Sequence, residues 1–463
     1  MYFERIFDRG LAQASYLIGC QATGEALVVD PRRDVDVYSR IADREGLRIS
    51  HVTETHIHAD YLSGSRELAA ATGAELLLSD MGGSEWRYSF EHEALGDRDH
   101  FMVGNIRVEA VHTPGHTPEH LTFIITDTPA GDAPTMALTG DFMFVGDVGR
   151  PDLLEKAAQQ SGTQEAGARD LYHSLQKAAA LPAYLPVWPG HGAGSACGKA
   201  LGAVPSSSIG YEQATSWVYR SPNEDAFVRT ILDGQPEPPT YFGRMKLQNR
   251  EGPPLLGNLP APGPLSSDEI EEAMGRGAQL VDARSKESFA AGYIPGSLNI
   301  QGDSGFSNWA GWSLDPDKPV VLLAPEREIE GLVRGLIRVG IDNIVGYASS
   351  LADWTSSGRS LAIVSQIEPK KLFKERDRYT VFDVRGADEW RDGHIDGARH
   401  IHVGHLRSHL AEIAEAERVV LHCASGARST LGASILSSLG IGEVMNLTGG
   451  MDAWRAEGLP VSL

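Results

Sequence analysis

An internal repeat in the C-terminal part of this 463-residue chain is the feature that most restricts its fold. The stretch LVDARSKESFAAGYIPGSLNI at 280–300 matches VFDVRGADEWRDGHIDGARHI at 381–401 in spacing and in residue type. In each copy, short apolar runs alternate with amphipathic stretches, which is the pattern of parallel strands connected by helices. The repeat therefore predicts two similar α/β domains with parallel sheets, over residues 266–364 and 365–463.

The chain before the repeat has a different pattern. The stretch EGPPLLGNLPAPGPL at 251–265 is rich in proline, so we expect a stiffened linker there. Residues 1–250 combine short strands, such as ALVVD at 26–30, with helices such as SGSRELAAATG at 63–73. Their histidines concentrate at predicted strand ends and loops, where active sites usually lie. We expect a mixed α/β domain with an active site in this first part.

The composition excludes several classes of protein. With 41% hydrophobic and 22% charged residues and no apolar run long enough to cross a bilayer, we expect a globular protein with no membrane partner. The net charge of −21 disfavours nucleic acid as a partner. The first ten residues, MYFERIFDRG, do not resemble a signal peptide, and the three cysteines include no CxxC pair. These features predict reduced thiols and a cytoplasmic location.

Clusters of histidine and aspartate occur four times in the first domain, each just after an apolar run. The clusters are THIHADY at 55–61, HTPGHTPEH at 112–120, LTGDFMF at 138–144 and WPGHG at 188–192. A single histidine is usually a buried polar residue, but this many at strand ends in one domain favour a metal site. A set of turn histidines without a metal is the alternative interpretation.

The motif order HxHxD, TPGHT, TGD and a late GH resembles the metallo-β-lactamase superfamily. The resemblance implies an αββα sandwich with these loops at one edge of two packed sheets. Two-metal hydrolases of that superfamily have HxHxDH, but Tyr61 replaces the last histidine in this chain. A phenol with a pKa of about 10 is a poor ligand at neutral pH. We therefore expect one metal rather than two.

Persulfide dioxygenases, a branch of this superfamily, resemble the first domain over nearly all of its length. The matching stretches are THIHADYLSG, TPGHT, TGDFMFVGDVGRPDL and GSACGKALG. The resemblance implies mononuclear iron(II) as the cofactor, held by His56, His116 and Asp141. Two histidines and one carboxylate leave coordination positions open for substrate sulfur and O2. Zinc in a thioesterase would instead be held by a closed tetrahedral set plus water.

Other polar residues of these motifs are expected to surround the metal. Four of them would lie next to the ligands, where they orient them or hydrogen-bond to the substrate. These four are His58, Asp60, Tyr61 and His191. His112 and His120 flank the TPGHT loop and are either supporting residues or purely structural.

Two further residues of the first domain have two interpretations each. Arg150 offers a guanidinium suited to a carboxylate or phosphate on a thiol cofactor, which would make it a substrate-binding residue. A salt bridge with Asp152 is the other interpretation. Cys197, six residues past His191, is either a small buried thiol or a relay for sulfane sulfur. The relay is suggested by a resemblance to bacterial fused persulfide dioxygenases.

The last domain contains VVLHCASGARS at 419–429, in which a strand ends at Cys423 and a helix follows. Successive amides and a helix N-terminus lower the pKa of a thiol in such a loop, and the resulting thiolate can accept sulfane sulfur. Together with FDVR, GHIDGA and LTGGMDAW, this loop resembles a rhodanese, which is a sulfurtransferase domain. The resemblance implies that Cys423 is the nucleophile and that Arg428 closes the loop. Asp383 and Arg385 are expected to be structural.

The middle copy keeps the frame of this domain but not its chemistry. Asp282 and Arg284 match the frame of the last copy, whereas Ala324 stands where Cys423 stands. Alanine cannot carry sulfur. We expect a rhodanese-like domain without catalytic capacity that serves as a spacer or docking surface.

Joined in one chain, the activities that these resemblances imply would convert a persulfide into thiosulfate, as in sulfide detoxification. The small-molecule partners would be a thiol persulfide, O2, sulfite and thiosulfate, and a homo-oligomer is compatible with such a family. Two other functions stay open. One is a zinc-dependent glyoxalase II-type thioesterase fused to a sulfurtransferase, and the other is a non-catalytic sulfur carrier or sensor.

Overall fold

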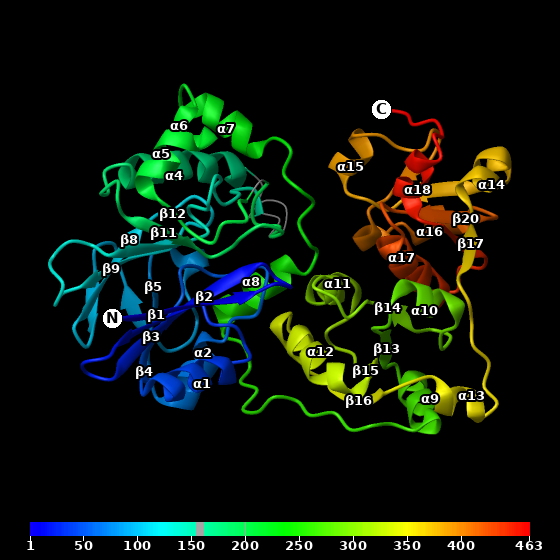
Figure 1. Cartoon of the computed structure of the whole chain (residues 1–463), viewed down its shortest axis with the longest axis horizontal. Coiled ribbons are helices and arrows are strands. Elements are labelled where there is room, and N and C mark those ends of the chain that lie inside the picture. Colours follow the sequence, from blue (N-terminus) through cyan, green and yellow to red (C-terminus); the bar gives the residue numbers. More distant parts are fainter. Residues whose placement is uncertain (154–161, 200) are drawn as a thin grey trace. The chain divides into compact units, whose positions relative to one another are not determined.

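The computed structural model describes residues 1–153, 162–199 and 201–463 of the chain. The contacts divide these residues into two compact units (Figure 1). The first unit comprises Met1–Leu259 with Ile337–Gly340, and the second comprises Pro260–Leu336 with Ile341–Leu463.

Two six-stranded sheets form the centre of the first unit. The first sheet has the order β1-β2-β3-β4-β5-β6, with β1 (Tyr2–Asp8), β2 (Gln13–Cys20), β3 (Glu25–Val29), β4 (Arg48–Thr53), β5 (Glu75–Ser79) and β6 (Glu93–Leu95). The second has the order β12-β11-β10-β9-β8-β7, with β7 (His100–Val103), β8 (Ile106–His112), β9 (Leu121–Asp127), β10 (Met136–Gly140), β11 (Pro186–Pro189) and β12 (Ser207–Ser208).

The sheets pack face to face because alternate residues of their strands are apolar. In β8, for example, Ile106, Val108 and Ala110 are buried and belong to the core between the sheets. Full burial of side chains of this kind stabilises a fold by about 1.5–3 kcal/mol each for the larger ones. The shared core contains residues of both sheets, so neither sheet exposes this face to water.

Helices cover the outer faces of both sheets. Helices α1 (Asp36–Glu45) and α2 (Ser65–Thr72) share a core with the first sheet. Helices α4 (Thr163–Ala178), α5 (Ile209–Thr215), α6 (Trp217–Arg220) and α7 (Glu224–Leu232) share a core with the second sheet. The short η1 (Ser84–Trp86) and helix α8 (Phe242–Glu251) complete the unit. The predicted αββα sandwich is confirmed.

The proline-rich stretch after α8 contains no helix or strand until α9 begins at Ser267. Its first part lies against the first unit, because the carbonyl of Pro253 accepts a hydrogen bond from Arg66 at 2.8 Å and that of Pro254 accepts one from Arg33 at 2.8 Å. At its end, the backbone N–H of Leu265 donates to the carbonyl of Tyr347 at 2.8 Å, so the segment is anchored at both ends.

The second unit contains two parallel sheets, one for each copy of the repeat. The middle copy has the order β14-β13-β15-β16, with β13 (Gln279–Asp282), β14 (Leu298–Asn299), β15 (Val320–Leu323) and β16 (Ile344–Ala348). The last copy has the order β17-β21-β20-β18-β19, with β17 (Ser365–Ile367), β18 (Thr380–Asp383), β19 (Arg399–His400), β20 (Val419–His422) and β21 (Val444–Leu447). The paired strands in both sheets are parallel, as predicted.

Helices alternate with these strands along the chain. Those of the middle copy are α9 (Ser267–Gly275), α10 (Lys286–Ala291), α11 (Phe306–Ser313), α12 (Glu326–Arg338) and α13 (Ala352–Ser356). Those of the last copy are α14 (Pro369–Lys374), η2 (Arg376–Arg378), α15 (Ala387–Arg391), η3 (Val403–His405), α16 (Leu410–Ala414), α17 (Ala427–Ser438) and α18 (Gly450–Ala456).

One ion pair recurs in both copies, and we call it the Asp–Arg latch. In the last copy, Arg385 pairs with the buried Asp383 at 2.6 Å and donates to the carbonyl of Gly393 at 2.8 Å. In the middle copy, Arg284 pairs with Asp282 at 2.5 Å and donates to the carbonyl of Gly292 at 2.8 Å. Each latch ties the end of a strand to the end of the helix that follows it.

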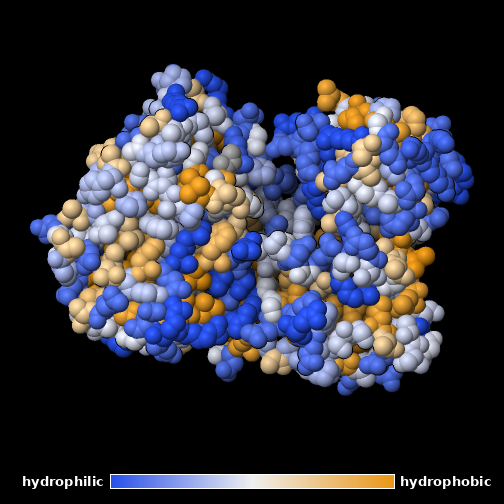
Figure 2. Space-filling model, in the orientation of Figure 1, coloured by the Kyte–Doolittle hydropathy of each residue, from blue (hydrophilic) through white to orange (hydrophobic). Residues whose placement is uncertain are grey.

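The surface of each unit is mixed in polarity. Figure 2 shows hydrophilic residues interspersed with smaller hydrophobic patches on the visible face of both units, in keeping with a net charge of −21. Among the described residues, the helices are too short or too polar to cross a membrane.

Candidate active sites

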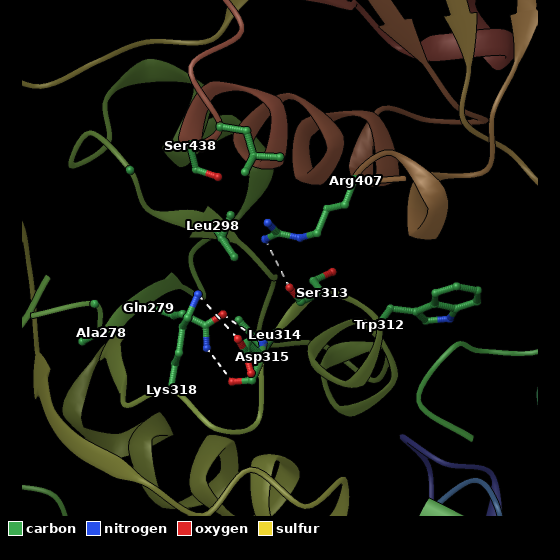
Figure 3. A pocket seen from close by; sticks show the side chains of 13 residues that line it. Ala278, Gln279, Leu298, Trp312, Ser313, Leu314, Asp315, Lys318, Arg407 and Ser438 are labelled. Carbon is green, nitrogen blue, oxygen red and sulfur yellow. Dashed lines mark hydrogen bonds and ion pairs between the residues drawn. The ribbon is translucent and has the colours of Figure 1, made fainter. Parts of the chain in front are cut away.

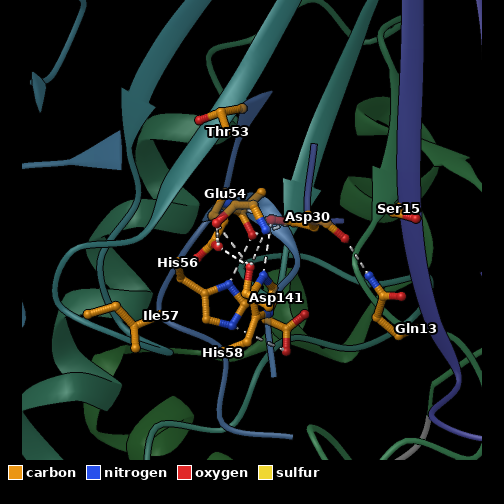
Figure 4. Close-up of polar contacts among 12 residues, drawn as sticks. Gln13, Ser15, Asp30, Thr53, Glu54, His56, Ile57, His58 and Asp141 are labelled. Carbon is orange, nitrogen blue, oxygen red and sulfur yellow. Dashed lines mark hydrogen bonds and ion pairs between the residues drawn. The ribbon is translucent and has the colours of Figure 1, made fainter. Parts of the chain in front are cut away.

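Three loops of the first unit bring His56, His116 and Asp141 together. These loops follow β4, β8 and β10, and each of the three residues offers one atom that lies within 4.8 Å of the other two. The Nε2 atom of His116 lies 3.5 Å from Asp141 Oδ2, and the Nε2 atom of His56 lies 3.9 Å from it. All three side chains are buried. The residues predicted as ligands therefore converge, and Figure 4 shows His56 and Asp141 in this position.

The hydrogen bonds of these residues leave the converging atoms free for a cation. His116 donates from Nδ1 to the carbonyl of Arg150 at 2.9 Å, and Nδ1 of His56 lies 2.9 Å from Thr55 Oγ1. Burial lowers the pKa of both imidazoles, so both are neutral at pH 7. Asp141 Oδ2 is buried and has no hydrogen-bond partner among the described residues. Two neutral imidazole nitrogens facing an orphaned carboxylate oxygen fit a divalent metal.

His191 orients Asp141 from the other side. Its Nδ1 lies 2.7 Å from Asp141 Oδ1, and its Nε2 lies 2.8 Å from Asp60 Oδ2. Burial alone would lower the pKa of His191, but the two carboxylates reverse this and raise it well above its usual value. His191 is therefore a cation that donates to both acids. It fixes one oxygen of Asp141 and leaves the other facing His56 and His116.

His58 does not join the three converging residues. Its Nε2 lies 3.1 Å from Asp30 Oδ1 (Figure 4). Burial would lower the pKa of His58, but Asp30 reverses this and raises it to about 9. Asp30 also accepts hydrogen bonds from the backbone N–H of Thr55 at 2.7 Å and from its hydroxyl at 3.0 Å. Nε2 of the second histidine of HxHxD is therefore held by a carboxylate, while its buried Nδ1 has no hydrogen-bond partner among the described residues.

Two buried acids that the motif analysis missed hold the HxHxD loop. One is Asp30, and the other is Glu119, whose Oε1 accepts a hydrogen bond from the backbone N–H of Ile57 at 2.7 Å. Burial raises the pKa of Glu119 to about 7. The sequence signals were an aspartate that ends the run ALVVD and a glutamate inside TPEH, neither of which indicates its contact by itself.

Tyr61 and His120 support the centre, whereas His112 has a local contact. The hydroxyl of Tyr61 donates to the carbonyl of Asp30 at 3.2 Å, and burial raises the pKa of this phenol well above 10. Tyr61 is thus neutral and hydrogen-bonded elsewhere. His120 Nε2 accepts from the backbone N–H of Asp141 at 3.1 Å, which supports a ligand candidate. His112 Nε2 contacts the carbonyl of Pro118 at 2.7 Å.

Arg150 forms the salt bridge that was the alternative to substrate binding. Its guanidinium contacts both carboxylate oxygens of Asp152 at 2.7 Å and is fully buried. The guanidinium nitrogens that bind Asp152 therefore do not face a substrate, and a substrate-binding role for Arg150 stays a prediction. Cys197 is also buried, and one ligand atom from each of Asp60, His191 and Cys197 lies within 4.8 Å of the others. Burial raises the pKa of the Cys197 thiol, so it is protonated at neutral pH.

In the second unit, Cys423 follows the central strand β20 and begins the loop that leads into α17. Its Sγ accepts hydrogen bonds from the backbone N–H of Gly426 at 3.1 Å and from the Ser429 hydroxyl at 3.5 Å. Gly426 has φ +102°, a conformation that favours glycine. The backbone N–H of Met451 donates to the carbonyl of Cys423 at 2.8 Å, so the LTGGMDAW segment supports the loop. A sulfur anion at Cys423 would be stabilised by these donors.

Arg428 has a carboxylate partner that the sequence did not indicate. Its guanidinium contacts both oxygens of Glu389, at 2.5 and 2.8 Å. Burial would lower the pKa of Arg428, but Glu389 raises it, and Cys423 adds to the rise. Arg428 lies at the loop as expected, but its charge is largely compensated. That it closes an anion site stays a prediction.

The middle copy has no comparable loop. Ala324 follows β15 as Cys423 follows β20, but the next residue is Pro325, which has no N–H, and α12 begins at Glu326. A proline and an early helix replace the amides that would surround an anion. This part of the middle copy therefore lacks both the nucleophile and the donors.

Family models match three segments of the chain. The model described as the metallo-beta-lactamase superfamily matches residues 8–191, and the rhodanese-like domain model matches residues 266–357 and 368–457. The first segment contains the ligand candidates, and the last contains Cys423.

Individual proteins are similar to parts of the chain. The human mitochondrial persulfide dioxygenase ETHE1 is 30% identical over 195 residues, which are 41% of this chain and 67% of that protein. A hydroxyacylglutathione hydrolase from Rhodospirillum rubrum is 31% identical over 176 residues, which are 38% of this chain and 60% of that protein. A crystal structure of a metallo-beta-lactamase from Staphylococcus aureus is 41% identical with a TM-score of 0.70, and the match covers 75% of this chain and 99% of that one.

Proposed function

We propose that this chain, which belongs to the metallo-beta-lactamase superfamily and carries two rhodanese-like domains, is an iron(II)-dependent persulfide dioxygenase joined to a sulfurtransferase. In the first reaction, a thiol persulfide reacts with O2 and water: RSSH + O2 + H2O → RSH + SO3²⁻ + 2H⁺. The outer sulfur loses four electrons and O2 gains four. In the second, RSSH + SO3²⁻ → RSH + S2O3²⁻, with Cys423 as the intermediate sulfur carrier.

The set of free donor atoms carries the proposal for the first reaction. Two imidazole Nε2 atoms and one carboxylate oxygen converge, while His58, a third histidine of the motif, is engaged by Asp30. His56, His116 and Asp141 would hold the metal. When bound, iron(II) would supply open coordination positions for O2 and the persulfide sulfur. His191 keeps Asp141 ionised and oriented. This matters because only three side chains would hold the metal, and each must present its ligand atom in the right direction.

The second reaction rests on the loop around Cys423. The thiolate would attack the outer sulfur of a persulfide, the S–S bond of the donor would break, and the donor thiolate would leave. The N–H of Gly426 and the hydroxyl of Ser429 would then hold the Cys423 persulfide. Attack by sulfite on its outer sulfur gives thiosulfate and restores the thiolate.

A zinc-dependent thioesterase is the second candidate. The 31% identity to a hydroxyacylglutathione hydrolase favours it about as much as the likeness to a persulfide dioxygenase favours the first. The two candidates differ in their need for O2 and in their metal, so one experiment separates them.

The test is O2 uptake by iron-loaded full-length protein given glutathione persulfide, with sulfite and thiosulfate quantified against an enzyme-free control. We expect uptake with thiosulfate as the main product. In Cys423→Ser, uptake should continue while sulfite replaces thiosulfate. Absence of uptake, together with thioester cleavage by the zinc-loaded protein, would contradict the dioxygenase proposal. Absence of both activities would leave a sulfur carrier.

A further inference from the structure

A lysine of the middle copy reaches the sulfur-transfer loop of the last copy. Lys286 is the first residue of α10, and its Nζ donates to the carbonyl of Ser425 at 2.7 Å. The repeat aligns Lys286 with Ala387, so the last copy has no cation of its own at this position. A domain without a nucleophile thus places an ammonium group at its neighbour's loop.

Contacts inside the second unit fix α10 in this position. The backbone N–H of Lys286 donates to Gln301 Oε1 at 2.8 Å, which holds the start of the helix. The hydroxyl of Tyr293 lies 3.2 Å from Ser437 Oγ, and the hydroxyl of Ser434 accepts from the backbone N–H of Asn299 at 3.0 Å. Both serines belong to α17, the helix that follows the Cys423 loop.

A cavity of about 400 Å³ lies where these two copies meet at the loop. Lys286, Glu287 and Ala290 of α10 line one side, and Ser425, Gly426 and Thr430 line the other. A Cβ atom placed on Gly426 would lie 3.8 Å from Lys286 Nζ. The N–H of the same glycine donates to Cys423 Sγ at 3.1 Å. The Ser425 carbonyl that Lys286 contacts and the Gly426 N–H that holds Cys423 Sγ belong to the same trans peptide bond, so the ammonium group and the reactive sulfur lie on opposite sides of one peptide unit.

The charges around the loop make Lys286 the cation that faces this cavity. Arg428 is bound through both of its terminal nitrogens to Glu389, which compensates its charge. Glu287 also lines this cavity, its carboxylate lies 3.8 Å from Lys286 Nζ, and its side chain is 71% exposed to water. An exposed pair at this distance leaves most of the ammonium field available to a ligand. Sulfite and thiosulfate are small anions that a lysine can bind through a charge-assisted hydrogen bond.

We propose that Lys286 of the middle copy binds the anionic sulfur substrate of the last copy and positions it for reaction at Cys423. This deepens the sulfurtransferase half of the proposed function and gives the middle copy a role that needs no nucleophile. Lys286 exchanges its bond to the Ser425 carbonyl for one to sulfite or thiosulfate.

Alkylation of Cys423 in the full-length protein tests this without requiring turnover. Iodoacetate is an anion and iodoacetamide is neutral, and both alkylate a thiolate. A unit charge a few ångströms from the thiolate changes the reaction rate of an anionic reagent by about tenfold. We expect Lys286→Met to slow alkylation of Cys423 by iodoacetate about tenfold, as read by mass spectrometry of its peptide, and to leave the iodoacetamide rate unchanged. Lys286→Arg should retain the iodoacetate rate.

Lys318→Met is the matched control. Lys318 also belongs to the middle copy, but it lines a different cavity of about 400 Å³ and lies 3.5 Å from the carboxylate of Asp315 (Figure 3). Its loss should leave both alkylation rates unchanged. An equal change of both rates in Lys286→Met would indicate a shifted loop and overturn the proposal, as would no change in either.

Steady-state kinetics supply the second measurement. Lys286→Met should raise KM for sulfite and thiosulfate about tenfold with kcat retained, and should spare a neutral thiol acceptor. A lowered kcat with unchanged KM would contradict a binding role. Wild-type protein that transfers no sulfur would defeat the proposed function, while the alkylation ratio would still decide the role of Lys286.

Discussion

Replacing Asp30 with asparagine is expected to destabilise the first unit at neutral pH and to have little effect at high pH. Asparagine has nearly the same shape and keeps an oxygen that can accept from Thr55 and His58. It removes the negative charge that keeps the buried His58 imidazole protonated. The variant therefore tests a charge rather than a shape.

The magnitude follows from the pKa of His58, which burial would lower but Asp30 raises from 6.5 to about 9. A pKa that is higher in the folded than in the unfolded state stabilises the fold fully below the unfolded value, and the contribution is lost as the pH rises through the folded value. At pH 6 and pH 7 the contribution is on the order of 2–3 kcal/mol, and at pH 9.5 it is close to zero. We expect Asp30→Asn to lose most of these amounts at each pH.

The measurement is pulse proteolysis of the first unit in urea at pH 6, 7 and 9.5, with a chelator present so that metal affinity does not enter. Asp36→Asn is the control, because Asp36 forms an exposed pair with Arg40 at 2.5 Å. Its loss should change the free energy of unfolding by less than about 0.5 kcal/mol. A loss of the same size at pH 6 and pH 9.5 in Asp30→Asn would refute the reasoning, because it would show that the hydrogen bonds, and not the charge, stabilise the loop.

Two other predictions follow from the candidate sites. Ala324→Cys should not give the middle copy sulfurtransferase activity in a Cys423→Ser background, because Pro325 offers no N–H and α12 begins at the next residue, Glu326. Activity within tenfold of the wild type would contradict this. His191→Gln should weaken iron binding by about 10–100-fold in a chelator competition, because Asp141 loses the cation that orients it. His112→Gln is the control and should not weaken iron binding, because His112 contacts the carbonyl of Pro118 instead. Equal iron affinities in the two variants would contradict the role of His191.

Local patterns were enough to predict the fold class and the place of the main site residues. The alternation of apolar residues in β8 and the repeat of strand and helix in the last two domains depend on neighbouring residues alone. Because His56, His116 and Asp141 each follow a strand, their convergence follows once two sheets are packed. The fold and the position of the cluster were therefore predictable.

The residues that the sequence did not indicate act across long separations. Asp30 reaches Thr55 because β3 pairs with β4 in parallel, and Glu389 reaches Arg428 across 39 residues. Lys286 contacts Ser425, 139 residues away in another copy of the fold. Each of these contacts depends on the register of paired strands or on a contact between domains. The sequence around a charged loop residue does not indicate which residue it will contact. For Arg150, the sequence allows both a substrate and Asp152 as the partner, and the structure shows that Asp152 binds the guanidinium.

The Asp–Arg latch is present with nearly the same bonds in a copy that can carry sulfur and in one that cannot. A survey that counted sulfurtransferases by the Asp-x-Arg signature would therefore record two enzymes in this chain, although the sequence contains one thiol in the position that matters. The latch is therefore a feature of the fold that both copies share. Activity is better read from the residue that follows the central strand and from the amides after it.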